Sequence, residues 1–93
     1  MLYVALYCPK ESCKPVESLS RRIEFEIPEG IKMVAEYWLQ HTNPHIIVVF
    51  ESDSYAPIMA MNSRWSDIFD CTVVPAITGE EGLELGSQML PKT

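Results

Sequence analysis

Aromatic side chains near the ends of two apolar segments are the strongest sign of a binding site in this sequence. Tyr7 closes the first segment, and Trp38 and His41 lie at the end of the second. A few polar groups among aromatic rings are typical of a pocket for a small apolar ligand. Core and interface packing is the first expectation for these aromatic residues, and a pocket that contains Tyr7, Trp38 and His41 is the alternative.

Glu36 is a further candidate for this pocket, because it lies two positions before Trp38 and shares its side of an extended strand. A partly buried carboxylate needs a partner. Without one, its pKa would rise and it could act as a general base. We expect an ion pair with Lys32 or an arginine, and we keep the base as the alternative.

Cys8 and Cys13 form a second group with chemical potential, and four residues separate them. Thiols near the start of a helix can bind metal or take part in redox chemistry. The Cys-x-x-Cys spacing is missing, however, and Cys71 is remote in sequence, so we expect structural cysteines with a metal or redox protein as the alternative. His41 and His45 flank a predicted turn, where we expect exposed histidines.

No phosphate-binding glycine loop, serine-hydrolase elbow or His-Glu-x-x-His motif is present, so the sequence predicts neither a cofactor nor a bound metal. Seven Lys and Arg against thirteen Asp and Glu give a net charge of −6, and such an acidic chain is poorly suited to bind nucleic acid. The sequence lacks an apolar run of the roughly 18 residues that a membrane span needs. The first residues do not resemble a signal peptide, and the expected location is cytoplasmic.

The 93 residues fit one domain, residues 1–93. Periodicity predicts strands over 2–7, 31–40, 45–51 and 69–77, and helices over 14–26, 54–67 and 79–90. Pro75 favours an edge position for the fourth strand, since proline cannot donate a hydrogen bond to a neighbour. Thr78 and Glu81 have the spacing of a capping box at the start of the last helix.

Each of the first two helices carries an apolar stripe that we expect to pack on the sheet. Together with the strand pattern, this order predicts an α+β, ferredoxin-like βαββαβ sandwich with strand order 4-1-3-2 and both helices on one face. The predicted stripes are Val16, Leu19, Ile23 and Ile27 in the first helix, and Ile58, Met61, Trp65 and Ile68 in the second.

The two central strands are apolar on both faces, although the helices can cover only one. The second face would expose an apolar patch larger than monomers usually carry. We therefore predict a homodimer whose two sheets pack against each other, with Tyr3, Ala5, Ile47 and Val49 on the dimer face. The alternative is that the short last helix folds back over its own sheet.

A set of short motifs in fixed order extends over most of the chain. They are Pro28-Glu29-Gly30, Trp38, Glu51, Trp65-Ser66-Asp67-Ile68-Phe69 and Val74-Pro75. With these motifs the chain resembles a family of domains of unknown function within the dimeric α/β-barrel superfamily. Leu39 follows Trp38, where the resemblance leads us to expect a polar residue or a histidine.

The resemblance implies a dimer with a cavity between the sheet and its helices. Members of the wider superfamily include cofactor-independent mono-oxygenases, haem-degrading enzymes, dehydratases and ligand-binding regulatory domains. Fold alone does not select among these activities. Our first hypothesis is a homodimeric module for a small apolar ligand or for protein interaction, and the alternative is a mono-oxygenase-like or isomerase-like enzyme.

Overall fold

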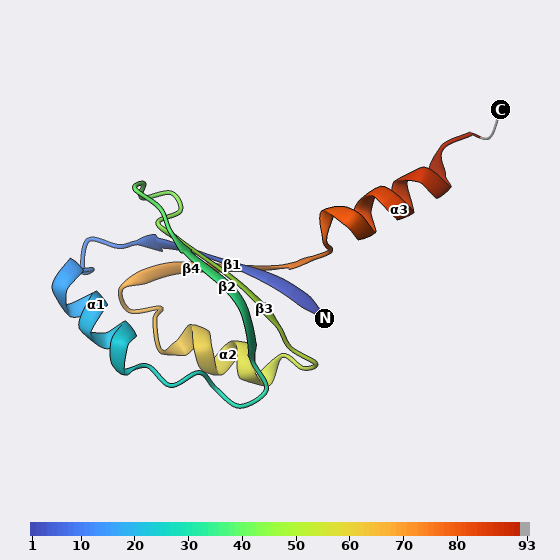
Figure 1. Ribbon diagram of the computed structural model, residues 1–93. Coiled ribbons are helices and arrows are strands. Elements are labelled where there is room, and N and C mark those ends of the chain that lie inside the picture. Colours follow the sequence, from blue (N-terminus) through green and yellow to red (C-terminus); the bar gives the residue numbers. More distant parts are fainter. Residues whose placement is uncertain (92–93) are drawn as a thin grey trace.

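The computed structural model describes residues 1–91 and shows, in that part of the chain, a four-stranded antiparallel sheet and three helices (Figure 1). The order of elements along the chain is the predicted one. The elements are β1 (Leu2–Pro9), α1 (Pro15–Glu24), β2 (Lys32–Trp38), β3 (Ile46–Glu51), α2 (Ala56–Ser63), β4 (Phe69–Ala76) and α3 (Gly79–Met89).

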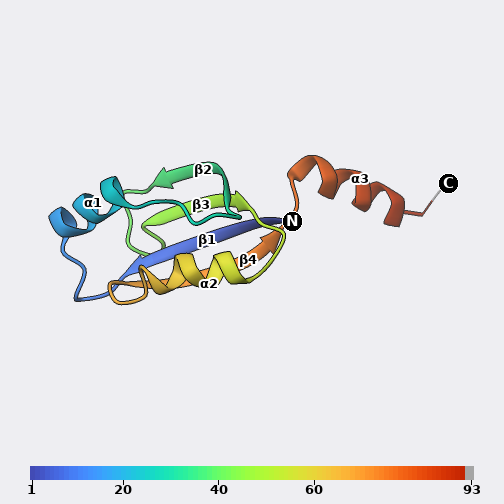
Figure 2. The same cartoon turned by 90° about the horizontal axis from the view of Figure 1, so that it is seen from below.

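The sheet has the order β2-β3-β1-β4, which confirms the predicted arrangement of the strands. Figures 1 and 2 show α1 and α2 on the same face of this sheet, as expected for a ferredoxin-like fold. β4 is an edge strand, so Pro75 lies where a missing backbone donor is tolerated. None of the helices within residues 1–91 has the length and apolarity that are needed to cross a membrane.

A bulge in β2 changes which of its residues face the helices. Met33 pairs with Phe50 of β3, but the next pair joins Ala35 to Val49, so Val34 is an extra residue. The simple alternation that the sequence suggests is therefore interrupted. As a result Met33 shares the helix-covered face with Glu36 and Trp38, which are opposite Val48 and Ile46 of β3.

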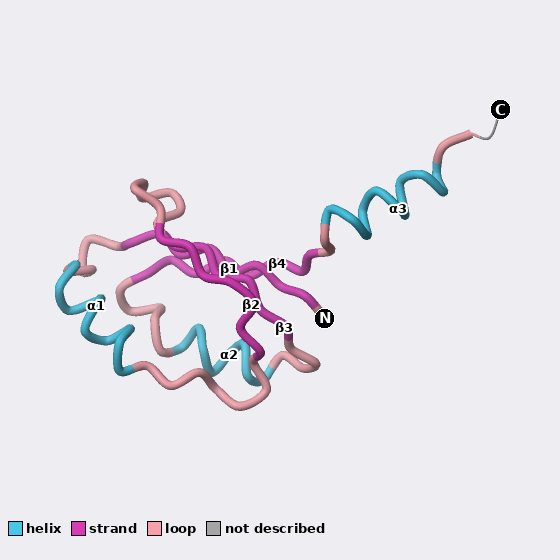
Figure 3. The backbone as a smooth tube through the Cα atoms, viewed as in Figure 1, coloured by secondary structure: helices cyan, strands magenta, loops and turns pink. Residues whose placement is uncertain are grey.

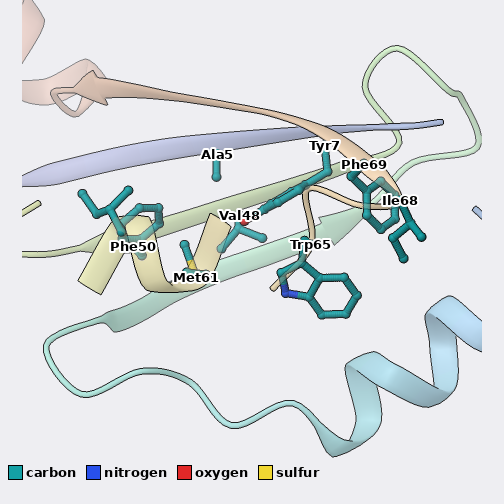
Figure 4. Close-up of a cluster of buried hydrophobic side chains, with 9 residues drawn as sticks. Ala5, Tyr7, Val48, Phe50, Met61, Trp65, Ile68 and Phe69 are labelled. Carbon is teal, nitrogen blue, oxygen red and sulfur yellow. The ribbon is translucent and has the colours of Figure 1, made fainter. Parts of the chain in front are cut away.

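The core lies between this face of the sheet and α2. Ala5, Phe50 and Ile58 are fully buried, and the predicted stripe Ile58, Met61, Trp65 and Ile68 is buried along its whole length. Figure 4 shows Trp65, Ile68 and Phe69 gathered where α2 leads into β4. The Trp65 and Phe69 rings pack on each other, with their centroids 6.0 Å apart.

The predicted stripe of α1 is confirmed only in part, because no residue of this helix is buried. Val16 is 81% exposed and Ile23 is 74% exposed, whereas Leu19 and Ile27 line a cavity. Pro15, Ser18 and Arg22 of the helix line the same cavity. Side-chain ion pairs hold the helix in place where the sequence predicts apolar packing.

The last helix does not fold back over the sheet, so that alternative is also wrong. The predicted capping box is confirmed, with the Thr78 hydroxyl accepting from the Glu81 backbone N–H and the Glu81 side chain accepting from the Thr78 backbone. In Figure 3 a short loop joins β4 to α3, and the helix then runs away from the rest of the molecule. Its apolar residues are exposed, with Leu83 at 78% and Met89 at 83%, and the chain extends over 57 Å in its longest direction.

Gly30 gives a test of the loop that leads from α1 into β2. Its φ of +95° disfavours any residue with a Cβ, and a Cβ there would lie 2.8 Å from Cγ of Pro57 in α2. We expect Gly30→Ala to lower the free energy of unfolding by about 1–2 kcal/mol in urea denaturation. Gly86→Ala is the matched control, since nothing lies within 4 Å of a Cβ at that helical position. Equal stability of Gly30→Ala and the unmodified protein would contradict the loop geometry.

Candidate functional site

A cavity of about 850 Å³ lies between the sheet, α1 and the end of α2. We call it the α1 cavity. Its walls are largely apolar and include Leu19 and Phe25 on one side and Val48, Trp65 and Phe69 on the other. The volume is in the range of sites that hold small organic molecules. At its rim the cavity meets solvent, because the lining residues Glu11, Trp38 and Thr42 are exposed.

One polar cluster lines this apolar cavity, and it joins α1 to β2. The Arg22 guanidinium donates through Nε to both Glu36 carboxylate oxygens, at 3.2 and 3.1 Å, and through Nη2 to Oε1 at 2.7 Å. The Trp38 indole N–H donates to Glu36 Oε2 at 2.6 Å. The bulge in β2 makes this cluster possible, because it places Glu36 and Trp38 on the same face of the sheet as α1.

The ion pair fixes the charge of both partners. Hydrogen bonds from Arg22 lower the pKa of Glu36, although burial opposes the shift, and the Trp38 hydrogen bond also lowers it. The hydrogen bond to Glu36 in turn raises the pKa of Arg22. Glu36 is therefore a fixed carboxylate that positions Arg22 and Trp38. The expected arginine partner is found, and the lowered pKa of Glu36 does not support the alternative role of a general base.

Tyr7 lines the same cavity and is only 5% exposed. Its ring packs edge to face on Phe69, with the centroids 5.9 Å apart. Burial raises the pKa of Tyr7 well above its usual value, and Cys71 and Glu36 raise it further. The hydroxyl is therefore a neutral hydrogen-bond donor, and within residues 1–91 no group of the protein forms a hydrogen bond with it.

Arg21 holds α1 from the other side. Its Nη1 and Nη2 donate to the two Asp67 carboxylate oxygens at 2.8 and 3.1 Å, and Nη1 also donates to the Arg64 carbonyl at 3.1 Å. The guanidinium lies 5.5 Å from the centre of the Trp65 ring. Arg22 thus binds α1 to β2, and Arg21 binds it to the segment after α2. The cavity lies between these two ion pairs.

The two histidines are arranged differently from the prediction. His41 does not line the α1 cavity, because its Nδ1 accepts from the Asn43 backbone N–H at 3.0 Å within the β2–β3 turn. His45 does line the cavity, and its Nδ1 lies 2.9 Å from the His41 carbonyl oxygen. The structure thus brings Tyr7, Glu36 and Trp38 together at the cavity and places His41 outside it.

Cys8, Cys13 and Cys71 are all free thiols, and each has different surroundings. Cys13 lines the α1 cavity, whereas the Cys8 thiol donates to Asn43 Oδ1 at 3.3 Å. Burial raises the pKa of Cys71 to about 11, so its thiol is a poor nucleophile at neutral pH. Among residues 1–91 there is no group of three or more His, Cys, Asp or Glu side chains that could hold a metal ion.

The face of the sheet opposite α1 and α2 carries a continuous apolar strip, which we call the open face. Pairs of facing residues form its centre: Val4 opposite Val49 and Leu6 opposite Ile47. Tyr37 of β2 lies beside Ile47 on the same face and is 58% exposed. The residues of the open face are Leu2, Val4, Leu6, Ala35, Tyr37, Ile47, Val49 and Val74.

The predicted dimer face needs a correction, because its four residues lie on both sides of the sheet. Ile47 and Val49 belong to the open face. Tyr3 and Ala5 pair with Phe50 and Val48 on the helix-covered face, and Ala5 is fully buried. The strand register, which the alternation within each strand does not specify, determines which residues share a face.

Arg22 is a site residue that the sequence did not single out, because only an unspecified arginine was expected as a partner of Glu36. A signal was available: Pro15, Ser18, Arg22 and Phe25 are spaced by three, four and three positions, which places them on one side of a helix. This mixed stripe predicts that the Arg22 side chain lies on the same side of α1 as Pro15 and Phe25 and faces an apolar environment.

Residues 1–90 match a protein family that is described as "Domain of unknown function (DUF3303)". No curated protein and no solved structure matches the chain. The family match extends over α1, the sheet and α3, so every residue of the α1 cavity and of the open face lies inside the matched region.

Proposed function

The chain belongs to this DUF3303 family of unknown function, and we propose that it is a homodimeric module that binds a small, largely apolar molecule in the α1 cavity. The observation that carries the proposal is the cavity itself. The cavity has a volume of about 850 Å³ and lies beneath a helix that has no buried residue. Hydrogen bonds to Glu36 from Arg22 and Trp38 fix the positions of these three polar side chains. Preorganised polar groups in an apolar cavity favour specific binding.

Binding is favoured over catalysis by the state of two ionisable groups in the cavity wall, Glu36 and Tyr7. Glu36 is held as a carboxylate by Arg22, and Tyr7 stays protonated because it is buried. Both groups are suited to orient a ligand and are poorly suited to exchange protons with it near neutral pH. Metal or redox chemistry has no support from Cys8 either, since its thiol hydrogen bonds to Asn43 in the turn.

The dimer part of the proposal rests on two apolar surfaces that the protomer leaves uncovered. Strand spacing and rise give the open face a footprint of about 20 by 25 Å, or roughly 500 Å². A standard interface buries about 800 Å² on each partner, so the sheet alone falls short. The exposed apolar side of α3, with Leu83 and Met89, supplies additional area. A second copy that contacts both surfaces reaches the size that stable association requires.

The composition of the open face agrees with such an interface. Its apolar centre is flanked by the ion pair of Lys32 with Glu51, whose charged atoms are 3.6 Å apart. An apolar centre with a polar rim is the usual make-up of a protein interface. The sheet order and the single helix-covered face are also compatible with the dimeric α/β-barrel superfamily. The three free thiols support a reducing, cytoplasmic environment for the assembly.

A pair of substitutions on α1 tests the proposed binding site. Ser18 lines the cavity and Ser20, two positions later, is exposed and outside it. We expect the neutral probe N-phenyl-1-naphthylamine to bind the unmodified protein saturably, with a rise in its fluorescence. Ser18→Phe fills part of the cavity and should weaken this binding by about tenfold or more, whereas Ser20→Phe leaves it unchanged. Absence of saturable binding, or equal affinities of the two variants, would contradict the proposed function.

A further inference from the structure

The guanidinium of Arg22 has donors left over after it has paired with Glu36. Its Nε and Nη2 are the groups that donate to the carboxylate. Within residues 1–91, Nη1 has no hydrogen-bond partner, although Arg22 lines the α1 cavity. A guanidinium presents its N–H groups in a fixed plane, so the position of the remaining donor is set by the pairing with Glu36.

The Tyr7 hydroxyl is a second donor without a hydrogen-bond partner among the described residues. Tyr7 lines the same cavity as Arg22 and is 5% exposed. Arg22 and Glu36 are near enough to influence its ionisation. In Figure 4 the Tyr7 ring lies beneath β1 on the same side of the sheet as Val48 and Trp65, which also line the cavity. A ligand that enters the cavity with an oxygen acceptor would give this hydroxyl a hydrogen bond in an apolar environment.

The charges around these donors select against an anionic ligand. Glu36 already neutralises Arg22, so a second carboxylate would face the repulsion of Glu36. Lys10, the other cation in the cavity wall, already donates to the Ser66 carbonyl at 2.7 Å and lies 3.9 Å from the Asp70 carboxylate. The net charge of the chain is −6, which adds a weaker unfavourable field. A neutral oxygen acceptor has a smaller desolvation cost and can accept from both donors.

We propose that the α1 cavity recognises an uncharged, largely apolar ligand through a carbonyl oxygen, which accepts hydrogen bonds from Arg22 Nη1 and the Tyr7 hydroxyl. This inference rests on the proposed binding function and adds the chemical class of the ligand. Trp65, Phe69 and Phe25 line the cavity with aromatic surface, which favours a flat ring system attached to the carbonyl group.

Three naphthalene derivatives with one skeleton test this inference: 2-acetylnaphthalene, 2-naphthoate and 2-ethylnaphthalene. Both tryptophans of the chain, Trp38 and Trp65, line the cavity, so each titration can be followed by tryptophan fluorescence and checked by calorimetry. We expect the ketone to bind about tenfold more tightly than the hydrocarbon and the carboxylate. Tyr7→Phe should remove most of the ketone's advantage over the hydrocarbon and leave the affinity for 2-ethylnaphthalene unchanged.

The outcomes separate the inference from the function on which it rests. If all three compounds bind but the carboxylate is the tightest, or if ketone and hydrocarbon bind equally, the inferred ligand class is wrong and the cavity remains a binding site. If none of the three binds, the proposed function fails together with the inference. The ranking on the unmodified protein is decisive even if Tyr7→Phe folds poorly, which thermal denaturation would reveal.

Discussion

Val49→Asp on the open face is expected to convert the proposed dimer into a monomer. Val49 lies opposite Val4 at the centre of the apolar strip. A carboxylate at that place would be buried against a second sheet without a partner, at a cost of several kcal/mol. The protomer fold should survive, because the side chain does not enter the helix-covered core. Light scattering coupled to size exclusion would show the halved mass.

Val16→Asp is the matched control for this experiment. Val16 lies on α1, on the other side of the sheet, and is 81% exposed. The same chemical change there should leave the oligomeric state as it is. A Val49→Asp variant with the mass of a dimer, or an unmodified protein that is monomeric at high micromolar concentration, would contradict the assignment of the open face to a second copy.

Glu36→Gln is expected to lower the free energy of unfolding by about 2 kcal/mol at pH 7, because it removes charge-assisted hydrogen bonds from Arg22. The difference should depend on pH. Arg22 lowers the pKa of Glu36 in the folded protein, so this stabilisation is fully present above the ordinary value of 4.5. It is lost as the pH falls through the lower pKa of the folded state. Urea denaturation between pH 7 and pH 3 would measure both stabilities.

Glu24→Gln provides the comparison, since Glu24 is an exposed acid on the same helix as Arg22. We expect no measurable change in stability at either pH. If Glu36→Gln shows the same deficit at pH 3 as at pH 7, then ionisation of Glu36 does not contribute to stability and its role as the anchor of Arg22 would be wrong.

The sequence predicts those parts of the fold that depend on local signals. The capping box of Thr78 and Glu81, the edge position of Pro75 and the buried stripe of α2 each follow from the chemistry of a few neighbouring residues. The strand order follows from the short connections and the handedness of the crossovers. These features can be predicted without knowledge of any long-range side-chain contact.

The polar part of the candidate site depends on long-range contacts that the sequence does not display. Val34 is an ordinary strand residue, and nothing in its type indicates that the ladder skips it. Because of that bulge, Glu36 faces α1 and meets Arg22, fourteen positions away in the chain. The apolar stripe of α1 was misleading, because periodicity shows that a helix is amphipathic but does not show how closely it packs on the sheet.

A crystal structure of the protein with 2-acetylnaphthalene bound is the decisive measurement for the α1 cavity. We expect the aromatic rings to lie between α1 and the sheet, with the carbonyl oxygen within hydrogen-bond distance of Arg22 Nη1 and the Tyr7 hydroxyl. A structure in which α1 is packed closely on the sheet, so that Leu19 and Phe25 fill the space and no ligand enters, would contradict this expectation.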